Sequence, residues 1–564
     1  MKINGAKAII KSLQKEGVQV IYGYPGGSVL TLYDELYKSG IPHILTGHEQ
    51  GAVHAADGYA RSTGKVGVCF ATSGPGVCNM VTGIATAYMD SVPLVIISGQ
   101  VSTYLIGRDS FQEADITGIV TPITKHNYLV KKAQDLPRVL KEAFFIARTG
   151  RPGPVLVDVA KDVFDTVIDY QYPDSVHLRG YSGVYTGRVQ DIDKVVAALA
   201  KAERPLLLTG GGTISADVAE GLRRIVDYTQ MPVASTLMGL GCIPASYKYH
   251  LGMAGMHGSY SANRAIMECD LLIAVGARFD DRVTGDVAAF APHAKIVHLD
   301  IDKVEINKII HADISVNGDL RWSMPLLTEK VLQSKAGFKK QYAAWARHVA
   351  ALKKAHPFAS ESRKNQITPQ TLLEAVQKYT DADTIVVTDV GQHQMWTAQF
   401  FGIEKPRHFI TSGGLGTMGF GLPAAMGAKC GNPDKRVVLM TGDGSIRMNC
   451  QEFNTLSKYG FNVITIVFHN RVLGMVSQWQ RLFYGGRYSQ TIIDDKINFT
   501  QLAESMGVKG MSVAKPSELD GVLKKAFAYK GPVLVDVELP EDEDVLPMVP
   551  GGKRLDQMIL GGEK

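Results

Sequence analysis

The sequence predicts an α/β protein of three doubly wound parallel-sheet domains, of which the first and third share a fold. Short apolar runs alternate with helical stretches along almost all of its 564 residues. This alternation is typical of parallel sheets covered by helices on both faces, and a chain of this length is too long for one hydrophobic core. The expected strands are residues 18–22, 44–46, 66–70, 94–98, 155–159, 206–209, 271–275, 296–299, 385–388, 437–440, 463–468 and 533–537.

An internal repeat supports the relation between the first and third domains. The segment Gly-Pro-Val-Leu-Val-Asp-Val occupies residues 153–159 and again 531–537, and a related helical stretch precedes each copy, at 140–144 and 523–527. Convergence of two unrelated helix–strand units is the alternative. Identity over the whole segment, together with the matching helix, favours a common origin. The middle domain is then a different α/β unit inserted between two related ones.

Two stretches have the composition of linkers. Residues 170–188 are rich in Tyr, Ser, Gly and Pro, and the region around 353–366 is polar. Cutting there predicts domains at 1–170, 188–350 and 366–545, followed by a C-terminal tail at 546–564.

Composition excludes several classes of protein. The net charge of +5 is small for this length and gives no reason to expect nucleic acid or a membrane as partner. The six cysteines are scattered without a C-x-x-C pair, so neither a disulfide framework nor a zinc site is predicted, and a reducing cytoplasm is the expected location. The longest apolar runs, such as 463–468, have the length of strands and not of membrane spans.

The expected strand 437–440 leads into Gly442-Asp443-Gly444-Ser445, and the expected strand 463–468 leads into Asn470. Ligands gather at the carboxyl ends of strands in open α/β sheets. Glycines there let the backbone approach a phosphate, while Asp443, Asn470 and the carbonyl of Val472 are oxygen ligands suited to Mg²⁺. Gly-Asp-Gly alone is also a common turn. The combination resembles the thiamine diphosphate signature, except that His469 stands where an Asn is usual.

Thiamine diphosphate reacts through a carbanion at C2 of its thiazolium ring, and enzymes of this class use a carboxylate that hydrogen-bonds the aminopyrimidine ring to help remove the C2 proton. Glu49 is the candidate for this carboxylate. It follows the expected strand 44–46 and precedes a helix of small residues at 51–60. An exposed Glu at a helix start, favoured by the helix dipole, is the alternative. Its position between the glycine-rich segments 23–27 and 72–76 favours a role in an active site that these loops would form together at one edge of the sheet. Ala52 excludes the zinc motif H-E-x-x-H.

Six segments together resemble the catalytic subunit of acetohydroxyacid synthase (acetolactate synthase) along the whole chain. They are residues 23–27, 48–50, 111–115 (FQEAD), 276–285 (GARFDDRVTG), 413–423 (GGLGTMGFGLP) and 474–488 (GMVSQWQRLFYGGRY). The resemblance implies decarboxylation of pyruvate on thiamine diphosphate. The hydroxyethyl carbanion then passes to a second pyruvate, giving 2-acetolactate, or to 2-ketobutyrate, giving 2-aceto-2-hydroxybutyrate. The first and third domains would bind the pyrimidine and the diphosphate of the cofactor.

The resemblance also implies roles for individual residues. The catalytic residues would be Gly27, Glu49, Phe111, Gln112 and Lys161. The thiamine diphosphate contacts would be Tyr24, Pro25, Glu49, Val390, Gly391, Gln392, His393, Gly416, Thr417, Met418, Gly442, Asp443, Gly444, Ser445, Asn470, Gly474 and Met475. The acceptor site would be shaped by Arg282, Met475, Val476 and Trp479. For Arg282, a surface ion pair with Asp280 or Asp281 is the alternative.

The middle domain resembles the FAD-binding domain of this family. Gly210-Gly211-Gly212 follows an expected strand, although three glycines alone are weak evidence for a nucleotide. The other implied FAD positions are Arg151, Thr236, Leu237, Met238, Met256, His257, Gly276, Ala277, Arg278, Asp280, Arg282, Val283, Asp300, Ile301, Asp319 and Leu320. The segment R-F-D-D at 278–281 argues against the flavin-free catabolic enzymes. Because the net reaction moves no electrons, the implied role of FAD is structural.

Other readings stay open beside this one. The nearest alternative is another flavin-containing thiamine diphosphate enzyme, namely glyoxylate carboligase, a pyruvate oxidase or an oxo-acid decarboxylase. Glu49 argues against glyoxylate carboligase, and Trp479 argues against the pyruvate oxidases. A non-catalytic scaffold would not be expected to keep Glu49, Asp443 and Asn470 together. The resemblance further implies a homodimer or homotetramer with active sites at the subunit interface, and a small regulatory subunit.

Ser102 stands where the family commonly has Pro, at a position that lines the herbicide site in plant enzymes, and Arg108-Asp109-Ser110 replaces the commoner Thr-Asp-Ala. We expect Ser102 to weaken sulfonylurea inhibition. An inhibition curve as tight as that of a Pro-containing homologue would contradict this.

Overall fold

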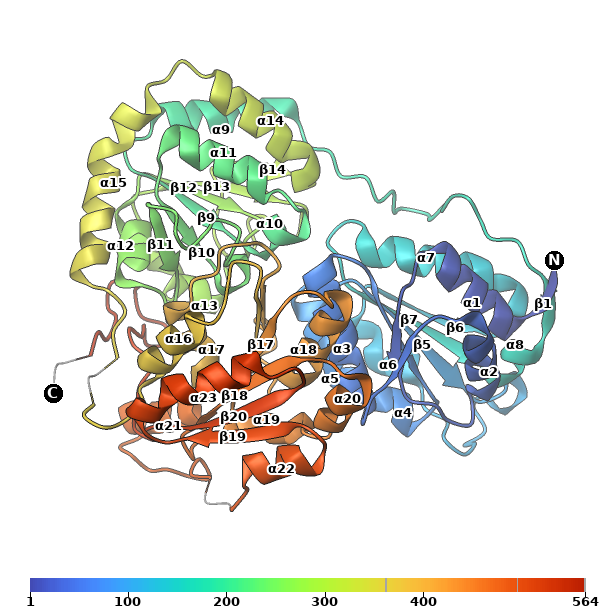
Figure 1. Ribbon diagram of the computed structural model, residues 1–564. Coiled ribbons are helices and arrows are strands. Elements are labelled where there is room, and N and C mark those ends of the chain that lie inside the picture. The colour runs from blue at the N-terminus through green and yellow to red at the C-terminus, as the bar shows by residue number, and fades with distance from the viewer. Residues whose placement is uncertain (361–362, 494–495, 562–564) are drawn as a thin grey trace.

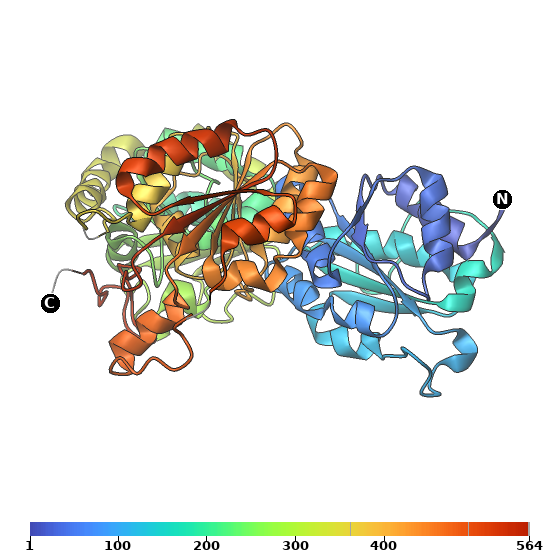
Figure 2. The ribbon, with the colours of Figure 1, turned by 60° about the horizontal axis from the view of Figure 1, so that its bottom comes forward.

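Three six-stranded parallel sheets form the frame of the molecule (Figure 1). The computed structural model describes residues 1–360, 363–493 and 496–561. Parts of the predicted second linker (361–362), third domain (494–495) and tail (562–564) lie outside the described residues. The middle domain lies at the upper left of Figure 1, the first domain at the right and the third below. Figure 2 shows the first domain set to one side of the other two.

The first sheet has the strand order β3-β2-β4-β5-β7-β6. Its strands are β2 (Ile21–Gly23), β3 (His43–Leu45), β4 (Gly67–Ala71), β5 (Leu94–Gln100), β6 (His126–Val130) and β7 (Pro154–Ala160). Its helices are α1 (Gly5–Lys15), α2 (Leu30–Ser39), α3 (Glu49–Thr63), α4 (Pro75–Cys78), α5 (Val81–Met89), α6 (Ile116–Val120), α7 (Leu136–Arg148) and α8 (Lys161–Asp165). A short antiparallel pair, β1 (Lys2–Asn4) with β8 (Val167–Asp169), joins the two ends of this domain.

The third sheet has the corresponding order, β16-β15-β17-β18-β20-β19. Its strands are β15 (Ile385–Thr388), β16 (Phe409–Ile410), β17 (Val437–Gly442), β18 (Val463–His469), β19 (Lys509–Val513) and β20 (Val533–Glu538). Its helices are α16 (Pro369–Gln377), α17 (Gln392–Phe400), α18 (Gly421–Gly431), α19 (Asp443–Ile446), α20 (Glu452–Tyr459), α21 (Gly474–Phe483), α22 (Phe499–Ser505) and α23 (Pro516–Ala528). The repeated heptapeptide forms β7 and β20, in the same place of each sheet, so the predicted common fold is confirmed.

The middle sheet has the order β11-β10-β9-β12-β13-β14 and therefore a different topology. Its strands are β9 (Pro205–Thr209), β10 (Val233–Ser235), β11 (His250–Met253), β12 (Leu271–Val275), β13 (Lys295–Asp300) and β14 (Ile314–Asn317). Its helices are α9 (Val189–Lys201), α10 (Gly211–Ser215), α11 (Ala219–Thr229), α12 (Tyr260–Glu268), α13 (Asp281–Thr284), α14 (Leu320–Gln333) and α15 (Phe338–Ala355). Helix α15 continues to Ala355, three residues into the stretch expected to be a linker. The predicted domain boundaries themselves stay predictions.

Every strand expected from an apolar run exists, with ends shifted by at most a few residues. Within the three six-stranded sheets, the strands without such a run are β6, β10, β11, β14, β16 and β19, and all except β10 lie at an edge. An edge strand has one neighbour and more contact with water, so its sequence mixes polar and apolar residues. Strand β10 is interior but has only three residues, too few for a periodic signal.

The first and third domains meet where α3 crosses α18 (Figure 1). A Cβ atom added at Gly58 of α3 would overlap the carbonyl oxygen of Ala424, and one added at Gly427 of α18 would overlap that of Ala55. The two backbones are therefore closer than side chains would allow. The apolar core is continuous across this crossing, since Ala52 and Phe420 belong to the same cluster of buried residues. None of the helices in the described ranges is long and apolar enough to span a membrane.

Replacing Gly427 with Ala tests the close crossing. We expect Gly427→Ala to lower the free energy of unfolding by about 1–3 kcal/mol or more, because the added methyl group must push the helices apart. The control is Gly521→Ala in α23, where an added Cβ meets no atom within 4 Å; it should be neutral or stabilise by roughly 0.5–1 kcal/mol. Thermal and urea melts measure both, and equal behaviour of the two variants would contradict the tight packing.

Candidate active site

Asp443 and Asn470 follow neighbouring strands of the third sheet. Strand β17 pairs with β18 in parallel, with Gly442 opposite Phe468, so the loops after both strands open at the same edge. One carboxylate oxygen of Asp443 accepts the backbone N–H of Gly444 at 2.8 Å, and the other accepts that of Arg471 at 2.7 Å. Asp443 therefore ties the two loops together. Burial raises the pKa of this carboxyl to about 6.

Asn470 completes a set of buried oxygen groups at this edge. Its Nδ2 donates to Oε1 of Gln392 at 3.3 Å, and its Oδ1 accepts the N–H of Val472 at 3.4 Å. No cluster of three His, Cys, Asp or Glu side chains suited to a metal occurs among the described residues. A cation here would instead take one carboxylate with amide and carbonyl oxygens, a set that suits Mg²⁺ when phosphate supplies further ligands.

The start of α17 packs against residues 442–445, the expected diphosphate loop. A Cβ atom at Gly442 would stand 2.8 Å from Nδ1 of His393, and one at Gly474 would overlap Oε1 of Gln392. Burial lowers the pKa of His393 to about 3, so its ring is neutral. Its Nε2 is buried without a hydrogen-bond partner in the described part of the chain. The structure thus brings the expected contacts at 391–393, 442–444, 470 and 474 together, with one polar atom left for a bound group.

Asp389 holds the loop that carries Gly416 and Met418. Its buried carboxylate accepts the N–H groups of Val390 at 3.0 Å, Gly419 at 2.9 Å and Gly421 at 3.2 Å. Burial raises its pKa to about 6 against these hydrogen bonds. Ser445 adds a link, because its hydroxyl donates to the carbonyl of Val390 at 2.9 Å. Asp389 was missed from the sequence, although a carboxylate directly after a buried strand was the available signal.

Glu49 lies at the first turn of α3, capped by His48. Its Oε2 accepts a hydrogen bond from Nδ2 of Asn79 at 3.0 Å, and its Oε1 would stand 3.3 Å from a Cβ at Gly76. Asn79 is the hydrogen-bond partner of this carboxylate within the described residues, and none of residues 442–445 bonds to it.

The glycine-rich loops of the first domain do form one rim. A Cβ at Gly26 would stand 2.5 Å from Thr72, and one at Gly74 would stand 2.8 Å from the carbonyl oxygen of Gln112. Gln112 has a φ of 60°, in the left-handed region, next to Phe111, which is 89% exposed. Tyr24, Pro25 and Gly27 follow β2, and Lys161 follows β7, so they lie at the same carboxyl edge of the sheet.

Arg282 of α13 reaches the third domain at α21. Its guanidinium lies over the ring of Trp479, 5.9 Å from the centroid, and one nitrogen is 3.6 Å from Sδ of Met256. The alternative ion pair is also present, with Asp281 at 3.4 Å, but both side chains are more than half exposed and such a pair contributes little. Met475 and the exposed Val476 lie on the same helix as Trp479. The expected acceptor residues are therefore neighbours.

His469, directly before Asn470, forms an ion pair within the third sheet. Its Nδ1 is 3.0 Å from Oδ1 of Asp536, which belongs to the second copy of the repeated segment. Burial lowers the pKa of His469, but the hydrogen bond and charge of Asp536 outweigh this, so the pKa is raised overall. The edge of Phe499 completes its surroundings. The unusual residue at this position is thus accounted for by packing within the third sheet.

The expected FAD positions gather at the carboxyl edge of the middle sheet. Each implied segment begins at or shortly after the end of a strand. The segments are 210–212 after β9, 236–238 after β10, 256–257 after β11, 276–283 after β12, 300–301 at the end of β13 and 319–320 after β14. This edge is where an open α/β sheet binds ligands. Arg151 approaches from the first domain, bonded to Asp302 at 3.2 Å and Glu305 at 2.8 Å.

Some of the residues at the expected FAD positions are accounted for by contacts within the protein, without a bound ligand. A Cβ at Gly210 would overlap the carbonyl oxygen of Gly276, and one at Gly212 would stand 2.8 Å from its Cα. These glycines therefore allow two loops to touch. Asp280 caps α13 and Asp319 caps α14 through their side chains. Asp300 is different: burial raises its pKa to about 6, and its carboxylate accepts the N–H of Asp302 at 2.8 Å.

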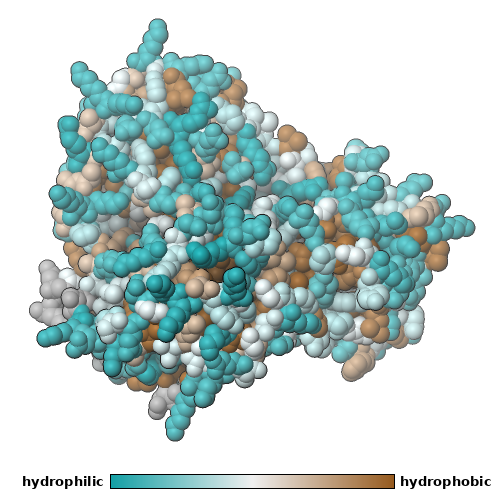
Figure 3. Space-filling view, in the orientation of Figure 1, coloured by the Kyte–Doolittle hydropathy of each residue, from teal (hydrophilic) through white to brown (hydrophobic). Residues whose placement is uncertain are grey.

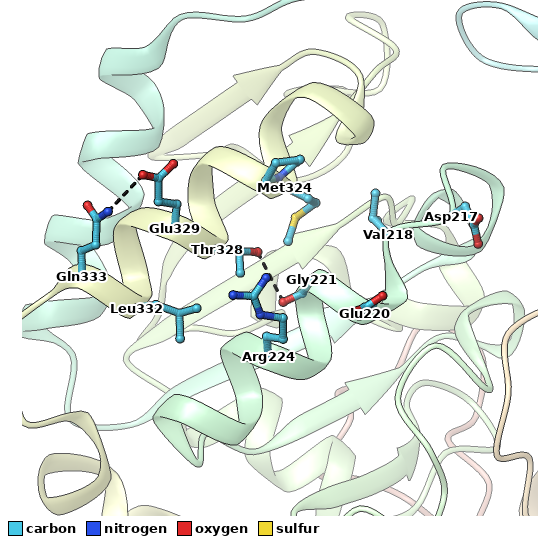
Figure 4. Close-up of a pocket in the computed structure, with 11 residues that line it drawn as sticks. Asp217, Val218, Glu220, Gly221, Arg224, Met324, Thr328, Glu329, Leu332 and Gln333 are labelled. Atoms are coloured by element: carbon cyan, nitrogen blue, oxygen red, sulfur yellow. Dashed lines mark hydrogen bonds between the residues drawn. The ribbon is translucent and has the colours of Figure 1, made fainter.

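A hollow of about 680 Å³ lies elsewhere, between α11 and α14 (Figure 4). It is lined by Asp217, Val218, Glu220, Gly221, Arg224, Met324, Pro325, Thr328, Glu329, Leu332 and Gln333. Gln333 points to Glu329 and Thr328 to Gly221, and each pair is hydrogen-bonded. None of the expected site residues lines this hollow. On the face seen in Figure 3, hydrophilic side chains predominate over the middle domain.

Comparison with known proteins agrees with this arrangement. Three models of thiamine pyrophosphate enzymes match: the N-terminal TPP binding domain at residues 3–119, the central domain at 192–327 and the C-terminal TPP binding domain at 389–537. The acetolactate synthase large subunit of Haemophilus influenzae is 47% identical over 99% of this chain and 98% of its own length. The probable large subunit of Methanocaldococcus jannaschii is 47% identical over 99% and 95%. The isozyme 2 large subunit of Escherichia coli is 44% identical over 99% of each. The chain therefore belongs to the acetolactate synthase large subunits, within the thiamine pyrophosphate enzymes.

Proposed function

We propose that the chain decarboxylates pyruvate and joins the resulting two-carbon unit to a second pyruvate, or to 2-ketobutyrate, in branched-chain amino acid biosynthesis. Identity of 44–47% to acetolactate synthase large subunits along the whole chain carries this proposal. The contact between Arg282 and Trp479 supports it, since a guanidinium held over an aromatic ring beside α21 suits the carboxylate of a 2-keto acid.

Thiamine diphosphate, when bound, supplies the carbon nucleophile of this chemistry. Asp443, Asn470 and the carbonyl of Val472 would hold Mg²⁺ against its diphosphate, and the neutral His393 leaves its buried Nε2 for the cofactor. Met418 lies close to Gly444, with its Cε 3.7 Å from a Cβ built there, and would support the thiazolium ring. FAD would lie at the carboxyl edge of the middle sheet in a structural role.

The two halves of the thiamine site would come from two subunits. Glu49 is bonded to Asn79 of its own domain, and Phe111 is 89% exposed beside Gln112. A second copy of the chain that covers this rim would bring its diphosphate loop to Glu49. We therefore propose a homodimer or homotetramer with active sites at the interface, together with a small regulatory subunit. We also propose a cytoplasmic location, which the unpaired state of all six cysteines supports.

Glu49 would hold the proton that activates the cofactor. Its carboxylate at the start of α3 would hydrogen-bond the aminopyrimidine ring and favour the tautomer that removes the C2 proton. Another flavin-containing thiamine diphosphate enzyme, such as an oxo-acid decarboxylase, would use the same activation with another acceptor. The molecule that accepts the two-carbon unit therefore distinguishes an acetolactate synthase from such an enzyme.

An acetolactate assay tests the proposed function. We expect product from pyruvate only when thiamine diphosphate and Mg²⁺ are both present, and a mixed product when 2-ketobutyrate competes in the same reaction. Aldehyde release without acetolactate would identify a decarboxylase instead. Absence of any product under all conditions would overturn the proposal.

Substituting Glu49 separates cofactor binding from cofactor activation. We expect Glu49→Gln to bind thiamine diphosphate nearly as well as the wild type, but to slow acetolactate formation by roughly 10²–10⁴-fold, the contribution of general acid–base assistance. The control is Glu374→Gln, an exposed carboxylate on α16 that pairs only with Gln370. Near-normal activity of the Glu49 variant would remove this residue from the mechanism.

A further inference from the structure

Two carboxylates cross the boundary between the first and third domains in opposite directions. Glu452 of α20 is fully buried, and its two oxygens accept the N–H of Gly47 at 3.0 and 3.1 Å and that of His48 at 3.2 Å. Asp90, at the end of α5, accepts the N–H of Gly413 at 3.0 Å and that of Gly414 at 2.7 Å. Each carboxylate thus binds two successive backbone groups of the other domain.

The two bound segments occupy equivalent places in the related domains. Residues 46–48 follow β3 at one edge of the first sheet, and residues 411–414 follow β16 at the same edge of the third. The carboxylates belong to the corresponding helices α5 and α20 but lie at opposite ends of them, because Asp90 follows the last residue of α5 and Glu452 is the first residue of α20. Each domain therefore binds the equivalent segment of its neighbour, but from a different position.

Glycines in the bound segments are required by this approach. A Cβ at Gly47 would stand 2.6 Å from Cγ of Gln451, and one at Gly51 would overlap Oε1 of Glu452. A Cβ at Gly414 would stand 2.8 Å from Oδ1 of Asp90. The backbone of each segment is therefore fitted to a carboxylate of the neighbouring domain.

The surroundings of the two carboxylates differ. Asp90 is paired with Arg61 at 2.9 Å, and Arg61 also donates to the carbonyl of Thr411 at 2.8 Å. Thr86 bonds Thr417 at 2.7 Å, further along the same loop. Glu452 has the hydroxyl of Thr455 at 2.7 Å and backbone N–H groups as its partners. Burial raises the pKa of Glu452, and the hydrogen bonds from Thr455, Gly47 and His48 oppose this by stabilising the carboxylate.

The bound segments lead directly into the two halves of the thiamine site. Glu49 follows His48, and Gly416 and Met418 follow Gly414. We propose that Glu452 and Asp90 are reciprocal positioning residues: Glu452 sets the position of the activating Glu49, and Asp90 sets the loop that supports the thiazolium ring. This inference rests on the proposed function of Glu49 and Met418. Each domain thereby orients the catalytic segment of its neighbour.

Glu452→Gln tests the first half. The amide oxygen of the variant can still accept both N–H groups from the position of Oε1, but the hydrogen bonds lose the negative charge that strengthens them, so the start of α3 should be held less firmly. We expect exchange of the thiamine C2 proton for deuterium, followed by NMR after acid quench, to slow about tenfold, the effect of weakening a buried charge-assisted hydrogen bond. The Kd for thiamine diphosphate with Mg²⁺, measured by calorimetry, should stay within about twofold, because the diphosphate loop is untouched.

Asp90→Asn tests the second half. We expect the Kd for thiamine diphosphate to rise about tenfold and the amides of residues 411–418 to exchange faster with deuterium, because one of the two glycine N–H groups loses its acceptor. The control is Asp270→Asn, whose carboxylate likewise accepts two successive N–H groups, of Glu203 and Arg204, but within the middle domain. It should leave both thiamine readouts unchanged.

The outcomes separate positioning from simple stabilisation. If the Glu452 and Asp90 variants lower the Tm as Asp270→Asn does and keep wild-type C2 exchange and cofactor affinity, the proposal is overturned. If Glu452→Gln does not fold, Glu452→Asp, which keeps the charge but has a shorter reach, takes its place: slowed C2 exchange supports the proposal and unchanged exchange overturns it. Wild-type protein that binds the cofactor and exchanges C2 without forming acetolactate would contradict the proposed function alone.

Discussion

The crossing of α3 and α18 is the contact on which the catalytic architecture depends. Glycine at positions 58 and 427 lets the two backbones touch, and the core continues through the crossing from one sheet to the other. Because the two domains have the same topology, this contact sets corresponding strand edges against each other. The loops that carry Glu49 and Met418 are both placed relative to it. A wider crossing would separate the carboxylates Glu452 and Asp90 from the backbone groups that they bind.

Buried carboxylates that bind the backbone of neighbouring loops recur in this molecule. Asp389, Asp443 and Glu452 are buried and hydrogen-bonded to backbone N–H groups of neighbouring loops. A buried charge is costly unless it is hydrogen-bonded, so each such group also specifies the shape of the loop around it. Asp443 is the carboxylate of this group that we propose to bind Mg²⁺ as well. Burial raises its pKa, and a bound divalent cation would have the opposite effect.

The middle domain contacts the third domain through Arg282 and carries its own strand edge. Arg282 lies over Trp479 although the two belong to different domains. The predicted C-terminal tail assists this placement, since the N–H of Val549 donates to the carbonyl of Met256 at 2.8 Å, beside Arg282. The glycines at 210, 212 and 276 have a structural reason of their own in the contact between two loops. The case for a dinucleotide therefore rests more on the shared strand edge than on the glycine triplet.

The sequence by itself determined the fold class, the relation between first and third domains, and the meeting of Gly442, Asp443 and Asn470 at one edge of the third sheet. These depend on local signals, namely continuous apolar runs, a repeated segment, and polar residues directly after strands. The edge strands other than β3 were not predictable because their sequences mix polar and apolar residues. The partner of His469, and the loop-holding roles of Glu452 and Asp90, were not predictable because their partners lie far away in the chain. Tertiary structure decided them: a carboxylate acquires its role only when packing buries it and brings the N–H groups of another segment within hydrogen-bonding distance.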